Sequence, residues 1–214
     1  MIPLKDDNPR LLFPFVTITL IVANIVAFYF EVTIGFEPIF AEFAAVPSDL
    51  IRFQNLKTVF TSMFLHGGYM HLAGNMLYLW IFGDNVEGSM GHGNFVVFYL
   101  ACGILALAGH IAFGGADDVP LVGASGAISG VLSGYLVRYP KAQVLVLIPI
   151  VWFITLRRIP AIIVLGLWFA FQVLNGVMTW NAQGGGVAFW AHIGGFVAGL
   201  LLIYLFPNRR RRYA

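Results

Sequence analysis

Two side chains in this sequence are of the types that nucleophilic hydrolysis needs. Ser125 lies in the run Gly123-Ala-Ser-Gly126, and His192 lies in Trp190-Ala-His-Ile-Gly-Gly195. A serine hydroxyl is a weak nucleophile until a base within hydrogen-bond reach takes its proton, and histidine is the commonest such base. We therefore predict that Ser125 is a nucleophile and that His192 is its general base, provided that the fold brings the two together.

The glycines near these residues have both a functional and a purely structural interpretation. Gly126, Gly130 and Gly134 recur every fourth residue, so on a helix they share one face. A face without side chains lets another helix approach closely, and in membrane helices this pattern is common as a packing motif alone. Gly195 and Gly199 give the last apolar segment a similar bare face. We expect the two bare faces to meet and to bring base and nucleophile together; the alternative is packing alone.

A histidine and an asparagine form a third candidate group. His71 and Asn75 are four residues apart, so a helix places them on one face. Hydrolysis of an amide passes through an oxyanion, which needs hydrogen-bond donors. The predicted donors are these two side chains and the backbone N–H of Ser125, which stands at the start of a predicted helix where N–H groups are free.

The composition indicates the kind of scaffold that must position these residues. Of the 214 residues, 59% are hydrophobic and 10% are charged, and the mean hydropathy is +0.85. Such a chain is typical of a membrane protein with several spans rather than of a soluble domain. We predict an all-α membrane protein with a single domain, residues 1–214, and six transmembrane helices at residues 11–30, 69–83, 95–113, 122–138, 161–178 and 189–206.

The distribution of lysine and arginine predicts an orientation. One side of a six-span arrangement holds both termini and the connection between the fourth and fifth spans, with Lys5, Arg10, Arg138, Lys141, Arg157, Arg158 and Arg209 to Arg212. The other side holds only Arg52 and Lys57. The positive-inside rule therefore predicts that both termini are cytoplasmic. The second, fourth and sixth spans then begin on the outer side, so the four candidate residues lie at a similar depth.

Four connecting segments have their own patterns. Residues 31–68 mix charged and aromatic residues, which fits an amphipathic segment in the membrane interface and an ordinary structured loop equally well. Residues 138–160 contain an apolar run that is too short to span and is interrupted by Pro149, which favours an interfacial or re-entrant segment. Residues 83–93 are predicted to form a turn-rich connection, and residues 180–187 a flexible glycine-rich loop.

Other classes of protein lack their characteristic residues here. No Asp or Glu falls inside a predicted span, so a Ser–His dyad is favoured over a triad, and an aspartyl intramembrane protease is disfavoured. The sequence has no His-Glu-x-x-His motif, and Cys102 is a single cysteine without metal-ligand spacing. A transporter would show intramembrane charges or inverted repeats, and neither is found. We expect no cofactor, no metal and no nucleic-acid partner.

Several polar and aromatic residues are predicted to be structural. His66 and His110 are expected to be ordinary buried histidines, and Glu87 a structural partner at the cytoplasmic end of the second span. Trp168 is expected to anchor the membrane interface or to fill a packing position.

Taken in order along the chain, these motifs resemble those of bacterial rhomboid intramembrane serine proteases. The motifs are His71-x-x-x-Asn75, Gly123-Ala-Ser-Gly126, Ala191-His-Ile-Gly-Gly195 with Gly199, and Gly83-x-x-x-Glu87-x-x-x-Gly91. The resemblance covers nearly the whole chain. It implies a six-transmembrane-helix rhomboid-like bundle whose first loop is a membrane-embedded hairpin.

The resemblance also implies roles for the candidate residues. Ser125 would be the nucleophile and His192 the general base and acid, while His71, Asn75 and the Ser125 amide would hold the oxyanion. The substrate would be a transmembrane segment of another protein, cut near its outer end through an acyl-enzyme intermediate. The fifth span and the loop at residues 180–187 would act as gate and cap.

Two positions depart from the family's pattern. The first loop of the family often has a Trp-Arg pair, where this chain has Leu56-Lys57-Thr58. Some members have an aromatic residue four positions after the nucleophile that stacks on the histidine, where this chain has Ser129. We therefore expect His192 to be held differently.

The predicted function is that of an intramembrane serine endopeptidase in a bacterial inner membrane, surrounded by lipid and acting on transmembrane proteins. The alternative is a non-catalytic protein of the same fold that binds or escorts membrane clients. Such a protein is expected to lack Ser125 or His192, and both are present. No particular oligomeric state is predicted.

Overall fold

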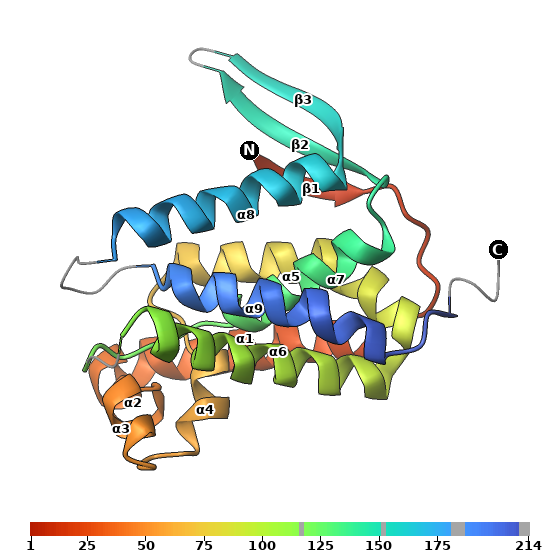
Figure 1. Cartoon of the computed structure of the whole chain (residues 1–214). Coiled ribbons are helices and arrows are strands. Elements are labelled where there is room, and N and C mark those ends of the chain that lie inside the picture. Colours follow the sequence, from red (N-terminus) through yellow and green to blue (C-terminus); the bar gives the residue numbers. More distant parts are fainter. Residues whose placement is uncertain (116–117, 151–152, 181–186, 210–214) are drawn as a thin grey trace.

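Helices form most of the structure, a computed structural model that describes residues 1–115, 118–150, 153–180 and 187–209 (Figure 1). The longest helices in this part of the chain are α1 (Phe15–Ile34), α5 (Tyr69–Met90), α6 (His92–Phe113), α7 (Ser125–Arg138), α8 (Ala161–Met178) and α9 (Phe189–Leu202). Among them, α1, α6 and α8 are long and apolar enough to cross a membrane. The predicted count of six spans goes beyond these helices and stays a prediction.

The helices α5, α7 and α9 lie between the apolar ones. Figure 1 shows α8 at one edge of the bundle and α1 and α6 on the opposite side. The inner three meet in a core to which α5 contributes Leu79 and Phe82, α7 contributes Leu132 and Tyr135, and α9 contributes Phe196. These three helices also carry the candidate residues and most of the glycine pattern, so the site is built on the interior of the bundle.

The second predicted span is longer than the sequence indicates. α5 continues to Met90 instead of ending at residue 83, so most of the predicted turn-rich connection is helical. Gly83, which suggested a turn, permits close packing instead, because a Cβ at this position would lie 3.1 Å from Thr17 Cγ2. Asp84 and Glu87 are therefore on the helix. The predicted spans contain no Asp or Glu, but the longer helix does.

The other predicted spans agree more closely with the helices. α8 has the predicted bounds, and α6, α7 and α9 differ from theirs by a few residues. A 3-10 turn, η2 (Ile203–Leu205), continues α9. α1 is shifted toward the C-terminus relative to residues 11–30, so it also includes Glu31, which is fully buried.

A three-stranded antiparallel sheet departs from the all-α prediction. Its strands pair in the order β1 (Ile2–Asp6), β2 (Gln143–Ile150) and β3 (Phe153–Pro160). The segment at residues 138–160, predicted to be interfacial or re-entrant, thus contains a β-hairpin that pairs with the N-terminal strand. Val144 and Val146 are fully buried while Leu145 and Leu147 are not. This period of two is typical of a strand, but it cannot be read from a run in which every residue is apolar.

The segment between α1 and α5 folds into short helices. They are α2 (Phe36–Phe43), α3 (Pro47–Ile51), α4 (Thr58–Thr61) and the 3-10 turn η1 (Ser62–Phe64). Ala45 and Leu121 exchange backbone hydrogen bonds of 3.1 and 2.7 Å, which tie this segment to the chain just before α7. A membrane-embedded position of this loop stays a prediction.

The glycines of α7 receive a different neighbour from the one predicted. A Cβ on Gly126 would lie 2.7 Å from Ala106 Cβ, and a Cβ on Gly130 would collide with Cys102, so this stripe mainly accommodates α6. The bare face of α9 rests instead on the backbone of α7, where a Cβ on Gly195 would collide with the carbonyl oxygen of Gly126. α7 and α9 do approach closely, but the glycines of α9 make most of the room.

Candidate active site

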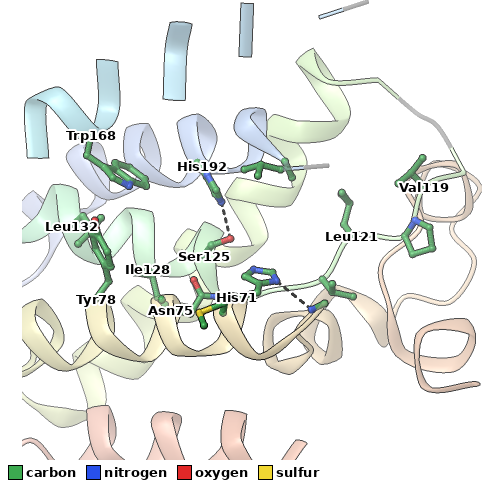
Figure 2. Close-up of a pocket in the computed structure, with 17 residues that line it drawn as sticks. His71, Asn75, Tyr78, Val119, Leu121, Ser125, Ile128, Leu132, Trp168 and His192 are labelled. Atoms are coloured by element: carbon green, nitrogen blue, oxygen red, sulfur yellow. Dashed lines mark hydrogen bonds between the residues drawn. The ribbon is translucent and has the colours of Figure 1, made fainter. Parts of the chain in front are cut away.

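The predicted nucleophile and base are in hydrogen-bond contact. Ser125 is the first residue of α7, and His192 lies in the first turn of α9. Both helices begin at the same end of the bundle (Figure 1). His192 Nε2 lies 2.8 Å from Ser125 Oγ, as the dashed line in Figure 2 shows. The close approach of α7 and α9 thus brings together two side chains that are 67 positions apart in the sequence.

A glutamine that sequence reasoning missed holds the other side of the imidazole. Gln172 of α8 is buried, and its Oε1 lies 2.8 Å from His192 Nδ1. Its Nε2 lies 3.3 Å from the carbonyl oxygen of Trp168, which supports this assignment of the amide atoms. An amide oxygen can only accept, so Nδ1 carries the proton and the lone pair of Nε2 faces Ser125. This is the tautomer that a general base needs.

Trp168 is a second contact of the imidazole. Its ring centroid lies 5.9 Å from that of His192, with 35° between the planes (Figure 2). The sequence predicts a packing or interface role for this tryptophan, and the structure adds a contact with the base. Ser129, at the position where some family members have an aromatic residue, instead donates to the carbonyl oxygen of Ser125 at 2.6 Å. The histidine is therefore held by Gln172 and Trp168 of α8 and not by a residue at position 129.

His71 presents a hydrogen-bond donor toward Ser125. Its Nδ1 accepts from the backbone N–H of Gly67 at 3.2 Å, so the neutral ring carries its proton on Nε2. Gly123 has a φ of 128°, and a Cβ there would lie 2.8 Å from His71 Nε2 and 3.5 Å from Ser125 Oγ. Glycine is needed at this position for its backbone conformation. A side chain here would crowd His71 Nε2, so its absence keeps this nitrogen accessible beside Ser125.

Asn75 is buried and one of its N–H groups is already used. Its Nδ2 donates to His66 Nε2 at 2.9 Å, which leaves one N–H for another acceptor. The backbone N–H of His66 donates in turn to the carboxylate of Glu31, at 3.0 and 3.2 Å to its two oxygens. Burial, together with the nearby His71, lowers the pKa of His66 to about 4, so its ring is neutral and accepts. His66 supports Asn75, in line with its predicted structural role.

A cavity of about 660 Å³ connects these residues. Ser125, His192, His71 and Asn75 all line it, and Figure 2 shows them around one space. Beyond them its wall is largely apolar, with Tyr78 from α5, Ile128 and Leu132 from α7, and Trp168 from α8. The predicted cap falls mostly on residues 181–186, which lie outside the described residues. The cavity can hold a chain segment next to the Ser–His pair.

The described residues offer no metal site. No group of three His, Cys, Asp or Glu side chains in this part of the chain is arranged to hold an ion.

Comparisons with known proteins agree with the motifs. The sequence model of the Rhomboid domain matches residues 54–209. The rhomboid protease GluP of Bacillus subtilis is 33% identical over 157 residues, which are 73% of this chain and 27% of that protein. The mitochondrial rhomboid protein 1 of Saccharomyces cerevisiae is 30% identical over 163 residues, 67% of this chain and 40% of that protein.

A third relative is more distant. The mitochondrial presenilin-associated rhomboid-like protein of Homo sapiens is 28% identical over 144 residues, 65% of this chain and 35% of that protein. The chain thus spans well under half the length of each of these relatives. The matched region contains every candidate residue of the cavity, and on this match the chain belongs to the rhomboid family.

Proposed function

We propose that this protein is an intramembrane serine endopeptidase that cuts transmembrane segments of other proteins. The observation that carries the proposal is the hydrogen-bonded series Ser125–His192–Gln172, in which both contacts are 2.8 Å long. In this series the Ser125 hydroxyl faces the lone pair of His192 Nε2, and the contact of Nδ1 with Gln172 fixes the tautomer of the imidazole. This is the arrangement that activates a serine for attack on a carbonyl carbon.

The reaction follows from the positions of the protons. His192 Nε2 takes the proton of Ser125 as Oγ bonds to the carbonyl carbon of the scissile peptide. His192 then returns this proton to the leaving amine as the C–N bond breaks, which leaves an acyl-enzyme ester on Ser125. A water molecule that gives a proton to the same nitrogen hydrolyses the ester, and the hydroxyl is restored. Gln172 accepts the Nδ1 hydrogen bond throughout and stabilises the imidazolium that forms between the steps.

The oxyanion of each tetrahedral intermediate needs donors on the other side of the carbonyl carbon. No side chain at Gly123 separates His71 Nε2 from Ser125, so we place the oxyanion between this nitrogen and the Ser125 backbone N–H. The His71 Nε2–H, the remaining N–H of Asn75 and the backbone N–H of Ser125 are the proposed donors. The N-terminus of α7 adds the positive end of its dipole.

The substrate class follows from the surroundings of the cavity. Its apolar wall and the apolar helices around it suit a segment that arrives from the bilayer. A soluble loop would gain little from such a wall. We propose a bacterial inner-membrane location with both termini cytoplasmic, supported by the distribution of lysine and arginine, so that cleavage takes place near the outer end of the substrate's span.

Labelling with a fluorophosphonate serine probe tests the proposal. The wild-type protein is expected to be labelled, and Ser125→Ala and His192→Ala are expected to remove the label because nucleophile and base are both required. Ser129→Ala is the matched control, since its hydroxyl is one helical turn away and bonds only to the backbone carbonyl of Ser125. Labelling that persists in Ser125→Ala, or no labelling of a folded wild-type protein, would favour the non-catalytic alternative.

A further inference from the structure

The β2–β3 hairpin has two chemically different faces. Side chains alternate between the faces of a strand, and paired residues share a face. One face carries Val144 and Val146, both fully buried against the rest of the molecule. The other face carries Leu145 opposite Arg158 and Leu147 opposite Leu156. β1 extends this outer face, because Lys5 pairs with Leu145 and Ile2 with Leu147.

Polarity also changes along the hairpin. Near its tip, Phe153, Ile154 and Leu156 are 78%, 71% and 53% exposed. Near its base four exposed side chains are basic, those of Lys5, Lys141, Arg157 and Arg158, and one is acidic, that of Asp7. A segment that emerges from a bilayer passes first from the acyl chains into the headgroups. Apolar side chains near the tip and basic side chains near the other end of the hairpin match this order. Large apolar side chains with this exposure are unfavourable in water.

The hairpin is also directly joined to a helix that is long and apolar enough to cross a membrane. β3 ends at Pro160 and α8 begins at Ala161, without an intervening residue. α8 is one of the helices long and apolar enough to cross a membrane, and Ile162, Ile163 and Leu167 along it are exposed. Figure 1 shows the hairpin standing away from the bundle beside α8. The base of the hairpin therefore lies where α8 enters the bilayer.

We propose that this hairpin is an anchor for an anionic lipid leaflet: its apolar tip inserts among the upper acyl chains, and its basic base binds lipid phosphates. The backbone limits the depth of insertion. β1 covers one edge of β2, but β3 is an edge strand in the sheet, and its unpaired N–H and C=O groups need water or headgroups as partners. The hairpin therefore lies in the interfacial region and does not cross the hydrocarbon core.

A fluorescent depth probe tests the anchor directly. In a Cys102→Ala background, Ile154→Cys is labelled with an environment-sensitive dye and the full-length protein is placed in vesicles with spin-labelled acyl chains. Gly93→Cys is the matched control, because Gly93 is exposed at the start of α6 and a Cβ there meets nothing within 4 Å. The label at position 154 is expected to be quenched at least about twofold more than the label at position 93.

A change of lipid charge tests the role of the basic side chains near the base of the hairpin. In vesicles of phosphatidylcholine with phosphatidylglycerol, Arg157→Gln combined with Arg158→Gln is expected to reduce quenching at position 154, whereas in phosphatidylcholine alone it is expected to change little. Circular dichroism checks that each variant is folded. Equal quenching at positions 154 and 93 would show that the tip lies no deeper than the first turn of α6, and would overturn the proposal. Quenching that does not depend on lipid charge or on the two arginines would overturn the role of the headgroups.

Discussion

The same two helices carry polar clusters at both of their ends, and the clusters differ in kind. At the end of the cavity, α5 contributes His71 and Asn75 and α7 contributes Ser125, all uncharged in the arrangement described above. At the other end, α5 contributes Asp84 and Glu87, and Tyr135 of α7 donates to Asp6 at 2.6 Å. The first cluster retains donors that face a cavity. In the second, each carboxylate accepts hydrogen bonds from protein groups.

Glu87 is an example from the second cluster, at the end of the bundle opposite the cavity. Its carboxylate accepts from the backbone N–H groups of Val16 and Thr17 at 2.9 and 2.8 Å, and from the Thr17 hydroxyl at 2.6 Å. His92 Nδ1 lies 2.6 Å from the same carboxylate. α1 has no side-chain cap of its own at its N-terminus. Glu87 of α5 therefore satisfies the free N–H groups of α1, and its negative charge interacts favourably with the positive end of the helix dipole.

Asp6 plays a similar part for the N-terminal strand. One of its oxygens accepts from Asn8, Asn85 and Tyr135, while Arg10 bonds to Asp84 at 2.8 Å. The comparison suggests a criterion for polar groups inside a membrane bundle. A group whose partners are all protein atoms holds the fold together, whereas a group with donors or lone pairs directed into a cavity is available for chemistry.

The largest expected effect is at the cavity end. Ser125→Ala should lower the rate of cleavage of a model transmembrane substrate by roughly 10⁴- to 10⁶-fold, because no other nucleophile takes its place. Its thermal unfolding in detergent should remain close to that of the wild type, since the hydroxyl makes one contact in a half-buried position. A large loss of stability with little loss of cleavage rate would contradict the assignment of Ser125 to the cluster that is available for chemistry.

Glu87→Gln should show the opposite pattern. We expect the free energy of unfolding to fall by about 2–4 kcal/mol, because an amide NH₂ would face donors that now find an oxygen. The cleavage rate per folded molecule should be unchanged. Glu42→Gln is the control, since Glu42 is exposed and pairs only with Lys57, and such a pair contributes about 0–1 kcal/mol. Equal losses for the two variants would contradict the assigned role.

The oxyanion donors come next. His71→Ala and Asn75→Ala should each lower kcat by about 100-fold, equivalent to roughly 3 kcal/mol of transition-state stabilisation. KM should change much less, because the donors act on charge that develops after binding. Asn94→Ala is the control, since Asn94 bonds to the carbonyl oxygen of Met90 far from the cavity. An effect confined to KM would remove these residues from the proposed oxyanion site.

Gln172→Leu should have a smaller effect. Loss of one hydrogen bond to Nδ1 should lower kcat by about 10-fold through misplacement of the imidazole. Gln172→Glu keeps an acceptor and adds a charge beside Nδ1, so it should retain activity and shift the pH profile of kcat upward. Asn175→Leu is the control, because Asn175 is also on α8, is half-buried and donates to the carbonyl oxygen of Phe171. An unchanged pH profile in the glutamate variant would argue that Gln172 only fills space.

The smallest expected effect is the pH dependence of stability that arises from Asp6 in the second cluster. Burial raises the pKa of Asp6 above its ordinary 3.8, against the opposing hydrogen bond from Tyr135. The folded state therefore favours the neutral form. Its contribution to stability is full below the ordinary pKa and is lost as pH rises through the raised value. Unfolding free energies measured across this range should show a shallow decline that Asp6→Asn reduces. A decline of unchanged size in Asp6→Asn would have another origin.

Part of this molecule is determined by local features of the sequence. Hydropathy predicted the apolar helices α1, α6 and α8, and α8 has the predicted bounds. Helical spacing predicted that His71 and Asn75 share one face, and the alternation of the predicted spans placed them level with Ser125 and His192. These inferences rest on length and period, which are properties of single helices.

The tertiary structure decided which groups meet. Gln172 is an intramembrane polar residue and so a possible signal, but only the packing of α8 against α9 shows that it contacts His192. The glycine spacing in α7 indicated that another helix packs closely against it, but it did not indicate which helix. The sheet was hidden because β2 is apolar at almost every position, and in a membrane protein buried and lipid-facing surfaces are both apolar. Partners distant in the sequence leave no local pattern, so the contacts that select catalytic groups from structural ones appear only in the folded chain.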